Sequence, residues 1–438
     1  MFKTLINAFK IEDLRKKLIY TFLMLIVIRI GSQLPVPGVN RDYFAAWFAA
    51  QNNGAFNFFD AFTGGSFSSM SLFALGVNPY ITSSIIVQLL TIAIPALEEM
   101  QKDGEDGKKK LQKITRYLTI VLALIEAVAM TIGFGNKGLL QEANFINGLG
   151  AVAALVAGSC FVMWIGERIT EKGVGNGISI VLLINIVSRM PDDFTTLFMQ
   201  FMKGQPVAKA VIAAVIILAV VLLTIVLVIF LQDGVRKIPV QYAKKMQGRK
   251  MVGGASTHIP LKVNTAGVIP VIFASSLMSF PGIIMMLIGK SNIEGVGGHI
   301  LNALSQQNWC SLEQPLYSVG LLIYILLVVF FAYFYTSITF NPNEVANNMK
   351  RQGGFVPGIR PGKPTSDFLG KILNYIIFIG AIGLIIVAVI PIFFNGVFGA
   401  SVSFGGTSLI IVVGVVLETI KQVEAQLVNR HYKGFLND

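Results

Sequence analysis

Apolar residues along the chain fall into blocks of roughly 17 to 24 positions, close to the roughly 20 residues that a helix needs to cross a hydrocarbon core. Polar and often basic segments separate these blocks. The pattern predicts an all-α membrane protein with ten transmembrane helices. The predicted spans are Leu18 to Pro35, Leu72 to Ile94, Tyr117 to Phe134, Ala151 to Ile169, Val174 to Met190, Val211 to Leu231, Ala266 to Ile288, Leu316 to Ile338, Leu373 to Phe394 and Ser408 to Leu427.

Ten spans divide into two groups of five, and an odd number of spans per group gives the groups opposite orientations in the membrane. Two inverted five-helix halves are therefore the expected architecture. Spans one to five form the first repeat, and spans six to ten, about 211–427, form the second. Along the chain this gives an N-terminal half (1–231), a polar loop (232–265) and a C-terminal half (266–438) with a second long loop (340–367).

The second and the seventh spans, each second in its half, are interrupted by helix-breaking residues. Breaks at matching positions of inverted repeats indicate the working interface of such a protein. The alternative is that Pro and Gly are simply more frequent in membrane helices than in soluble ones. The breaking residues are Gly64, Gly65, Gly76 and Pro79 in one span, and Gly267, Pro270, Pro281 and Gly282 in the other.

The aromatic and Gly/Ser-rich stretch from Phe56 to Ser71 is too polar to span a membrane and too apolar for an ordinary solvated loop. Irregular or short helical backbone is tolerated at membrane depth only where protein or a water-filled cavity surrounds it. We therefore expect this stretch in a partly hydrated cavity. A helix lying on the outer leaflet is the alternative.

Composition supports membrane insertion, because 54% of the residues are hydrophobic and only 13% are charged, half of the roughly 25% typical of soluble domains. Of the 35 Lys and Arg residues, 28 fall in segments on one side of the membrane, 6 fall in loops on the other, and Arg29 lies in the first span. Positive residues stay in the cytoplasm. Both termini are therefore predicted to be cytoplasmic, and the net charge of +12 requires no nucleic acid.

Two long loops on the cytoplasmic side, Gln232 to Val263 and Phe340 to Asp367, combine basic residues with Gly and Pro. Their central stretches, Gln241 to Lys250 and Phe355 to Pro364, place Arg and Lys on projecting tips that a partner could contact. The positive-inside rule explains the sign of their charge but not their length.

Candidate chemistry is sparse. The three histidines lie in separate segments without Cys or carboxylate at metal-ligand spacing, and the stretch from Gly358 to Thr365 lacks the spacing of a phosphate-binding loop. Glu126 is the single carboxylate well inside a predicted span, a thin basis for proton coupling. We expect no cofactor, no metal and no enzymatic activity.

Several long stretches carry a resemblance to a known family. They are RIGSQLPVPG (29–38), FTGGSFSSMSLFALGVNPYITSSIIVQLL (62–90), GVGNGISI (173–180), STHIPLKVNTAGVIPVIFASS (256–276), FNPNEVANNMKRQGGFVPGIRPG (340–362) and FGGTSLIIVV (404–413). With these motifs in order, the chain resembles the SecY family of bacterial protein-conducting channels over essentially its whole length. The resemblance implies a channel in the bacterial inner membrane that conducts unfolded polypeptides and releases apolar segments sideways into lipid.

The same resemblance implies how the parts act. Two halves would close like a clamshell around a pore, with a lateral gate formed by spans two, three, seven and eight, and with a plug at about Ala55 to Ser69 that includes Phe62, Gly64, Gly65, Ser66 and Phe67. Arg249, Lys250 and Arg360 would contact cytoplasmic partners. The implied partners are SecE, SecG, the SecA ATPase, the ribosome, the translocating polypeptide or signal sequence, and membrane lipid.

The family's pore constriction is a ring of aliphatic side chains. The matching positions here are Val77, Ile81, Ile178, Leu182, Ile272 and Ile411. Two pairs of these residues are four positions apart and so present one helix face each. An aliphatic ring can exclude water and ions yet yield to a polypeptide.

Two other functions compete with the channel. An inverted-repeat secondary transporter would share the broken helices, but it needs a compact polar site near the midplane. A scaffold that only assembles other membrane proteins needs no constriction. A leak of ions after enlargement of the ring would distinguish the channel from both.

Overall fold

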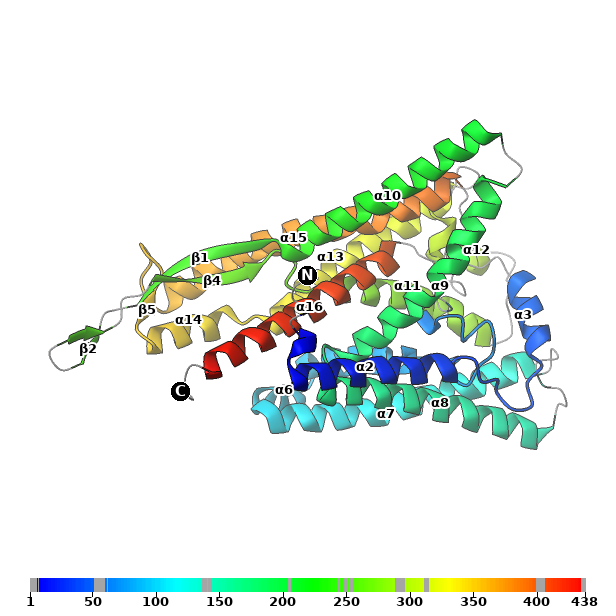
Figure 1. Ribbon diagram of the computed structural model, residues 1–438, viewed down its shortest axis with the longest axis horizontal. Helices are drawn as coiled ribbons and strands as arrows, with labels where there is room; N and C mark the ends of the chain where they lie inside the picture. The colour runs from blue at the N-terminus through cyan, green and yellow to red at the C-terminus, as the bar shows by residue number, and fades with distance from the viewer. Residues whose placement is uncertain are drawn as a thin grey trace.

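The computed structural model describes residues 6, 8–50, 60, 62–135, 140, 144–203, 206–242, 245–247, 250–252, 256–287, 296–310, 315–398 and 406–434. Each of the ten predicted apolar blocks overlaps one helix (Figure 1). These helices are α2 (Glu12–Gly31), α5 (Asn78–Ala93), α7 (Gly104–Phe134), α8 (Phe145–Lys172), α9 (Gly177–Phe201), α10 (Val207–Asp233), α11 (Ile269–Leu287), α13 (Val319–Thr339), α15 (Lys363–Phe398) and α16 (Gly406–Gly434).

Not all of these helices are equally apolar. By length and composition, five helices of the described part could cross a membrane, or up to six if α5 and α6 (Pro95–Lys102), which meet at 104°, count as one span. The other predicted spans coincide with helices that are shorter, such as the 16-residue α5, or that carry more charge, such as α2, which begins with two acidic residues followed by three basic ones.

The second span begins later than predicted. The chain from Leu72 to Val77 forms turns, and α5 starts only at Asn78 with Pro79 in its first turn, where a missing N–H costs no helical hydrogen bond. Gly76 has a φ of +55°, and a Cβ there would lie 3.1 Å from the Thr63 side chain. This left-handed turn, which favours glycine, keeps the helix from extending toward Leu72.

The helices form two groups. In the first, α7 packs against α5 and α8, and α8 packs against α2 and α9. In the second, α13 packs against α11 and α15, and α10 packs against α15 and α16. The groups meet where α9 contacts α16 and where α7 contacts α11, so two pairs of helices join them.

A small sheet, absent from the all-α prediction, joins the two long polar loops. Its strands β1 (Val235–Tyr242), β4 (Ser256–Lys262) and β5 (Gly354–Phe355) are antiparallel in the order β4-β1-β5. The short pair β2 (Lys245–Gln247) and β3 (Lys250–Val252) lies beyond them, at the projecting end of the molecule in Figure 1.

This sheet has its own apolar core. Ile238 and Val240 on alternate positions of β1 are buried together with Leu261 of β4, Met349 of α14 (Pro342–Arg351) and Leu369 of α15. Alternation of period two is the signal of a half-buried strand, and β1 shows it at Ile238 and Val240. The loops are therefore anchored to the helices at their bases.

The remaining short elements lie at the other end of the helices. They are α3 (Arg41–Ala50), α12 (Val296–Leu304) and the 3₁₀ helices η2 (Gln306–Asn308) and η3 (Pro315–Ser318). Trp309 is fully buried there and donates from its indole N–H to the Ala303 carbonyl at 2.6 Å.

Candidate functional site

The six predicted ring residues all belong to, or pack against, the largest apolar cluster that the described residues form. Val77, Leu182, Ile272 and Ile411 are among its buried members, and Ile81 and Ile178 pack against it half-buried. They arrive from the start of α5, from α9, from α11 and from α16, and so from both groups of helices. Segments far apart in the sequence thus contribute branched aliphatic side chains to this cluster, which also includes residues of other helices.

Close helix packing positions Ile178. A Cβ built on Gly166 of α8 would lie 2.4 Å from the Cδ1 atom of Ile178, and one built on Gly177 would lie 1.8 Å from the Gly166 carbonyl oxygen. Only glycines allow α8 and α9 to approach this closely. The turn of residues 175–177 (GNG) therefore fixes the beginning of α9. Asn176 also caps this helix, because its side-chain oxygen accepts from the Ile178 N–H at 3.1 Å.

One face of α9 carries both apolar and polar members of the site. Ile178, Leu182, Asn185 and Arg189 follow each other at intervals of four, three and four residues, which is the spacing of a single helical face. The first two belong to the apolar cluster, and the last two contact the segment before α5. The aliphatic residues and this segment therefore share one supporting helix.

The segment of residues 60 and 62–70, which we call the 60–70 segment, is buried between α2 and α9. Phe62, Thr63, Ser66 and Phe67 are each at most 4% exposed. Phe62 joins the largest apolar cluster, and Phe67 packs edge-on against Phe44 of α3 with ring centroids 5.5 Å apart. This burial excludes a helix lying on the outer leaflet.

The 60–70 segment is mostly turns and not a helix. Residues 62 and 63 are helical, and the turns begin at Gly64. Gly64 and Gly65 have φ values of +69° and +81°. A Cβ on Gly64 would lie 2.9 Å from both Arg29 Nη1 and the Asn185 Cα. The predicted breaks at these glycines are thus real, while residues 55–59 and 61 of the predicted plug lie outside the described residues.

Polar contacts hold the segment to its neighbours. The Asn185 side-chain amide donates to the Phe62 carbonyl at 3.0 Å, and Arg29 of α2 donates to the Gly64 carbonyl at 3.3 Å. Arg189 lies 2.9 Å from the Asp60 carboxylate, which is fully buried. Asn185, Arg189 and Asp60 were not among the predicted site residues. A lone Asp in an aromatic-rich stretch, and polar residues at the end of an apolar span, were the available signals.

The segment is also tied to the chain that follows α2. The Val36 N–H donates to the Met70 carbonyl at 3.1 Å, and the Leu72 N–H donates to the Leu34 carbonyl at 2.8 Å. The motif after Arg29 in the first span and the motif before the second span are therefore joined by backbone hydrogen bonds.

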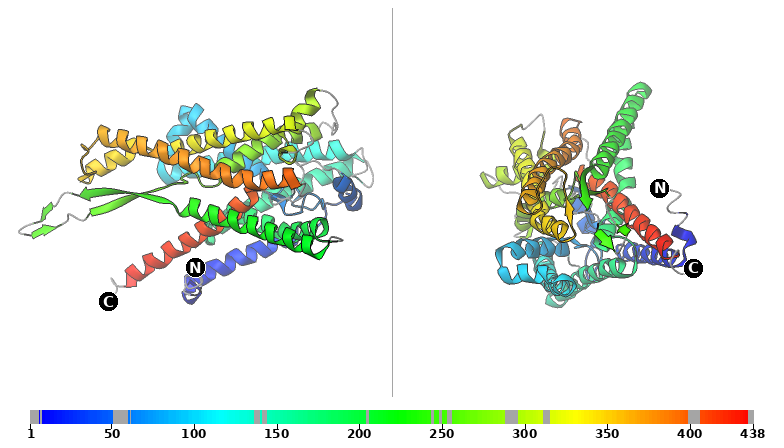
Figure 2. Two further views of the ribbon diagram at one scale, coloured as in Figure 1. Left: turned by 90° about the horizontal axis from the view of Figure 1, so that it is seen from above. Right: turned by 90° about the vertical axis from the view of Figure 1, so that its left-hand side faces the viewer.

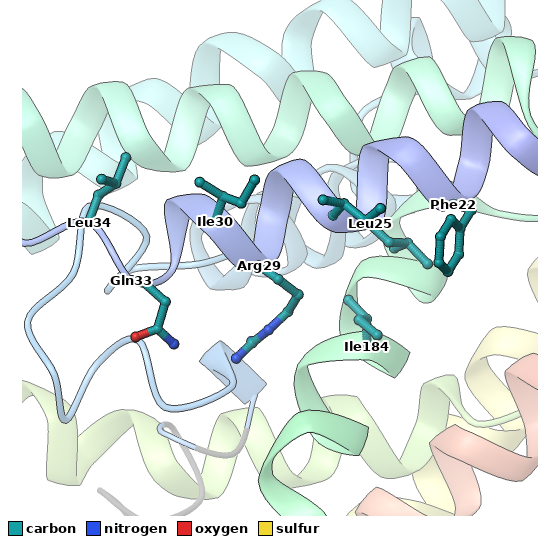
Figure 3. A pocket seen from close by; sticks show the side chains of 8 residues that line it. Phe22, Leu25, Arg29, Ile30, Gln33, Leu34 and Ile184 are labelled. Atoms are coloured by element: carbon teal, nitrogen blue, oxygen red, sulfur yellow. The ribbon is translucent and has the colours of Figure 1, made fainter.

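An apolar groove of about 500 Å³ runs along α2 (Figure 3). Its walls are Phe22, Leu25, Ile26, Arg29, Ile30, Gln33 and Leu34 with Ile184 of α9. Arg29 and Gln33 point away from α2 on one side, and Ile30 and Leu34 point to the other (Figure 3). Six of these eight residues are apolar, and the polar ones are Arg29 and Gln33.

The predicted docking residues fall in the loops that meet in the sheet. Arg249 lies outside the described residues, and Lys250 is the first residue of β3. Arg360 is exposed on a turn between Gly358 and Gly362, whose φ values are +82° and +104°. The Thr365 hydroxyl donates to the Arg360 carbonyl at 2.8 Å, so the backbone of this turn is held while the guanidinium is free to face a partner.

Comparisons with known proteins agree with one another. The model of the SecY family matches residues 71–420. The protein translocase subunit SecY of Halalkalibacterium halodurans is 44% identical over 443 residues, and that of Bacillus subtilis is 43% identical over 446 residues, with 100% of both chains covered in each case.

Solved structures give the same fold. One described as a protein conducting channel has a TM-score of 0.65 at 19% identity, covering 94% of this chain and 93% of its own. Sec61 from a canine ribosome-channel complex has a TM-score of 0.62 at 18% identity, covering 94% and 93%. The fold and the full-length relatives favour the channel over the transporter, and we conclude that the chain belongs to the SecY family and is the protein-conducting channel subunit of the Sec translocase.

Proposed function

We propose that Val77, Ile81, Ile178, Leu182, Ile272 and Ile411 form the constriction through which an unfolded polypeptide passes. The observation that carries this proposal is their convergence in one apolar cluster from both groups of helices. Aliphatic side chains offer no hydrogen bonds to water or ions, so a closed ring of them excludes both. A polypeptide in transit displaces the side chains without having to break specific contacts.

The 60–70 segment, together with the undescribed residues before it, acts as the plug. Its burial beside the ring-bearing face of α9 supports this role, because a segment in that place covers the constriction from one side. Its turns and glycines suit a segment that changes conformation more readily than a continuous helix does. During translocation the plug leaves this position, and afterwards it returns.

The lateral gate lies between the two five-helix halves, at the seam where α7 contacts α11. The gate helices in the family pattern are spans two, three, seven and eight, here α5, α7, α11 and α13. In support, α7 packs with α5 and α11 packs with α13, so each side of the seam is a helix pair that can move as a unit. Opening the seam lets sufficiently apolar segments leave the pore into lipid.

The sheet and its loops dock cytoplasmic partners. Arg249, Lys250 and Arg360 give the two loops positive charge, and arginine forms strong paired hydrogen bonds with acidic groups. Two structural neighbours are described as bound to ribosomes, the canine Sec61 channel and the yeast Ssh1 complex on the 80S ribosome. The ribosome and the SecA ATPase are the proposed partners here, with SecE and SecG as companion subunits in the membrane.

The chain itself performs no covalent chemistry in this account and takes its energy from SecA or the ribosome. It resides in the bacterial inner membrane with both termini in the cytoplasm. The orientation is supported by the start of α2 and the end of α16, which both lie toward the end from which β1 and β4 project (Figure 2). The basic loops and both ends of the chain are then on one side, as the distribution of Lys and Arg requires.

Enlarging the ring tests this function. The triple variant Ile81→Ala, Ile272→Ala, Ile411→Ala removes bulk from three of the four contributing elements, and ions are expected to leak through reconstituted vesicles without any polypeptide present. The matched control replaces three exposed aliphatic residues, Ile120, Ile216 and Leu326, by Ala. An enlarged ring that stays as tight to ions as this control contradicts the constriction.

A further inference from the structure

Asp60 and Arg189 form an ion pair at the base of the 60–70 segment. The distance between Asp60 Oδ2 and Arg189 Nη2 is 2.9 Å, and the side chains are 0% and 22% exposed. The contact is an ion pair by distance and does not have hydrogen-bond geometry. A carboxylate with no access to water depends on its cation, since burial of an unpaired charge is strongly unfavourable.

Asp60 also organises the segment internally. Its other oxygen, Oδ1, accepts the Ser68 N–H at 2.8 Å, and the Gly65 N–H donates to the Asp60 carbonyl at 3.1 Å. The carboxylate therefore links the first described residue of the segment to its far end and to α9 at once. Removing the Arg189 side chain would therefore loosen the whole turn from Asp60 to Ser68, and not the Asp60 side chain alone.

Arg189 has a second acidic neighbour. Its Nη1 atom lies 3.9 Å from Asp192, which is 73% exposed and belongs to the same helix. Arg29 also approaches the segment, but among the residues that the structure describes it contacts the Gly64 carbonyl and no carboxylate. When the segment leaves, Asp192 remains beside Arg189, and Asp60 enters water. The pair can therefore separate without leaving a buried charge unpaired on α9.

Several other buried polar atoms beside the 60–70 segment gain hydrogen bonds to water when the segment moves away. Ser66 Oγ and Asn185 Oδ1 are buried and have no hydrogen-bond partner within the described part of the chain, and the same holds for Arg189 Nε. Water supplies these hydrogen bonds once the segment moves away. The Asp60–Arg189 pair is thus the charged contact of a segment that is otherwise held by apolar packing and by hydrogen bonds to its backbone, while nearby polar atoms stay unsatisfied.

We propose that the Asp60–Arg189 pair is the latch that positions the plug in the closed channel, with Asp192 as the alternative partner of Arg189 when the plug is displaced. This inference rests on the proposed function, because it names what controls the plug of that same pore. Asp60 and Arg189 are positioning residues, and they contact no substrate.

The test is the frequency of spontaneous openings in planar bilayers that contain the full-length chain with its companion subunits and no translocating polypeptide. Asp60→Asn isolates the charge, because the Asn side-chain oxygen can still accept the Ser68 N–H. Asp60→Asn and Arg189→Gln are each expected to raise the opening frequency by about a hundredfold or more, as loss of one partner of a buried pair implies. Arg189→Lys, which keeps the charge, restores most of the closure.

Two further variants distinguish loss of the latch from a general destabilisation of the protein. In the double variant D60N/R189Q the effects do not add, because either change alone already breaks the pair. Asp192→Asn has the opposite sign and makes openings rarer, since the displaced state loses its compensating partner. Arg168→Gln removes an arginine from an exposed ion pair with Glu171 and leaves the opening frequency unchanged.

Precursor uptake in vesicles made from the same preparations distinguishes failure of the latch proposal from failure of the proposed channel function. If wild type and variants all take up precursor, and Asp60→Asn and Arg189→Gln open no more often than wild type, the latch is wrong and the channel stands. Additive effects in the double variant, or more frequent openings in Asp192→Asn, also overturn the latch. Failure of wild type to take up precursor is instead a failure of the proposed function.

Discussion

Gln241 of β1 lies directly opposite Phe355 of β5, so two loops more than a hundred residues apart in the sequence meet in one sheet. Tyr242 and Gly354 form the next pair, and a Cβ on Gly354 would lie 2.8 Å from the Tyr242 ring. The exposed turn that carries Arg360 is therefore held against the first loop. A partner that binds at this end meets both loops as one surface.

Reversal of charge on this surface tests the docking role. Arg360→Glu is expected to lower motor-driven precursor uptake by about tenfold or more, because a charge-assisted contact becomes a repulsive one. Insertion of the chain and the closed channel are unaffected, since the Arg360 side chain is exposed. Lys209→Glu, an exposed cation at the start of α10 toward the other end, is the control. Equal uptake by both variants would remove Arg360 from the docking surface.

The core beneath the sheet gives a second prediction. Leu261→Ala removes a buried side chain that packs with Ile238 and Val240, at a cost of about 2–5 kcal/mol to this small unit. The loops are expected to open locally, so trypsin cleaves faster at the exposed Lys237 and Lys262. Val235→Ala, at an exposed position of the same sheet, leaves the cleavage rate as it is. Unchanged proteolysis of L261A contradicts the sheet as a folded support.

Positive-φ glycines offer a comparison within the chain. Gly64→Ala combines left-handed backbone strain of about 1–2 kcal/mol with a Cβ 2.9 Å from Arg29 and Asn185. Gly267→Ala has similar backbone strain, with φ at +64°, but open space around the new Cβ. Ion leak is therefore expected from Gly64→Ala and not from Gly267→Ala. Equal leak from both would mean that contact with α2 and α9 does not seat the segment.

A buried carboxylate joins α7 to α8. Glu167 accepts from Arg116 Nε at 2.6 Å and from the Gln112 side chain at 3.1 Å. Glu167→Ala is expected to cost about 1–3 kcal/mol, reduced toward the lower end because the Arg116 side chain is 38% exposed. The melting temperature in detergent measures it. Glu171→Ala, which breaks the exposed pair with Arg168, should cost about 0–1 kcal/mol. The expectation fails if the two variants melt together.

Much of the fold was predictable because it follows from bilayer thickness. The apolar blocks match helices since a span has to cover a set length, and Gly64 and Gly65 marked real breaks because their left-handed backbone favours glycine. The ring residues came from family motifs, because aliphatic residues in a membrane helix carry no positional signal of their own. Their gathering in one cluster is tertiary information.

Other parts depended on contacts that a linear pattern does not contain. The alternation of Ile238 and Val240 was visible, but Pro239 between them and the basic neighbours favoured a loop. Asp60 and Arg189 belong to different predicted segments, and each taken alone resembles an ordinary polar residue near a span end. The pairing follows from the packing of the 60–70 segment against α9.

Uptake of an unfolded secretory precursor into sealed vesicles tests the central claim most directly. The vesicles contain this chain with its companion subunits, and SecA and ATP supply the energy. The account predicts that the precursor becomes protected from added protease only when the chain, SecA and ATP are all present. Vesicles that protect no precursor but accumulate a small solute against its gradient would contradict the channel and favour a transporter.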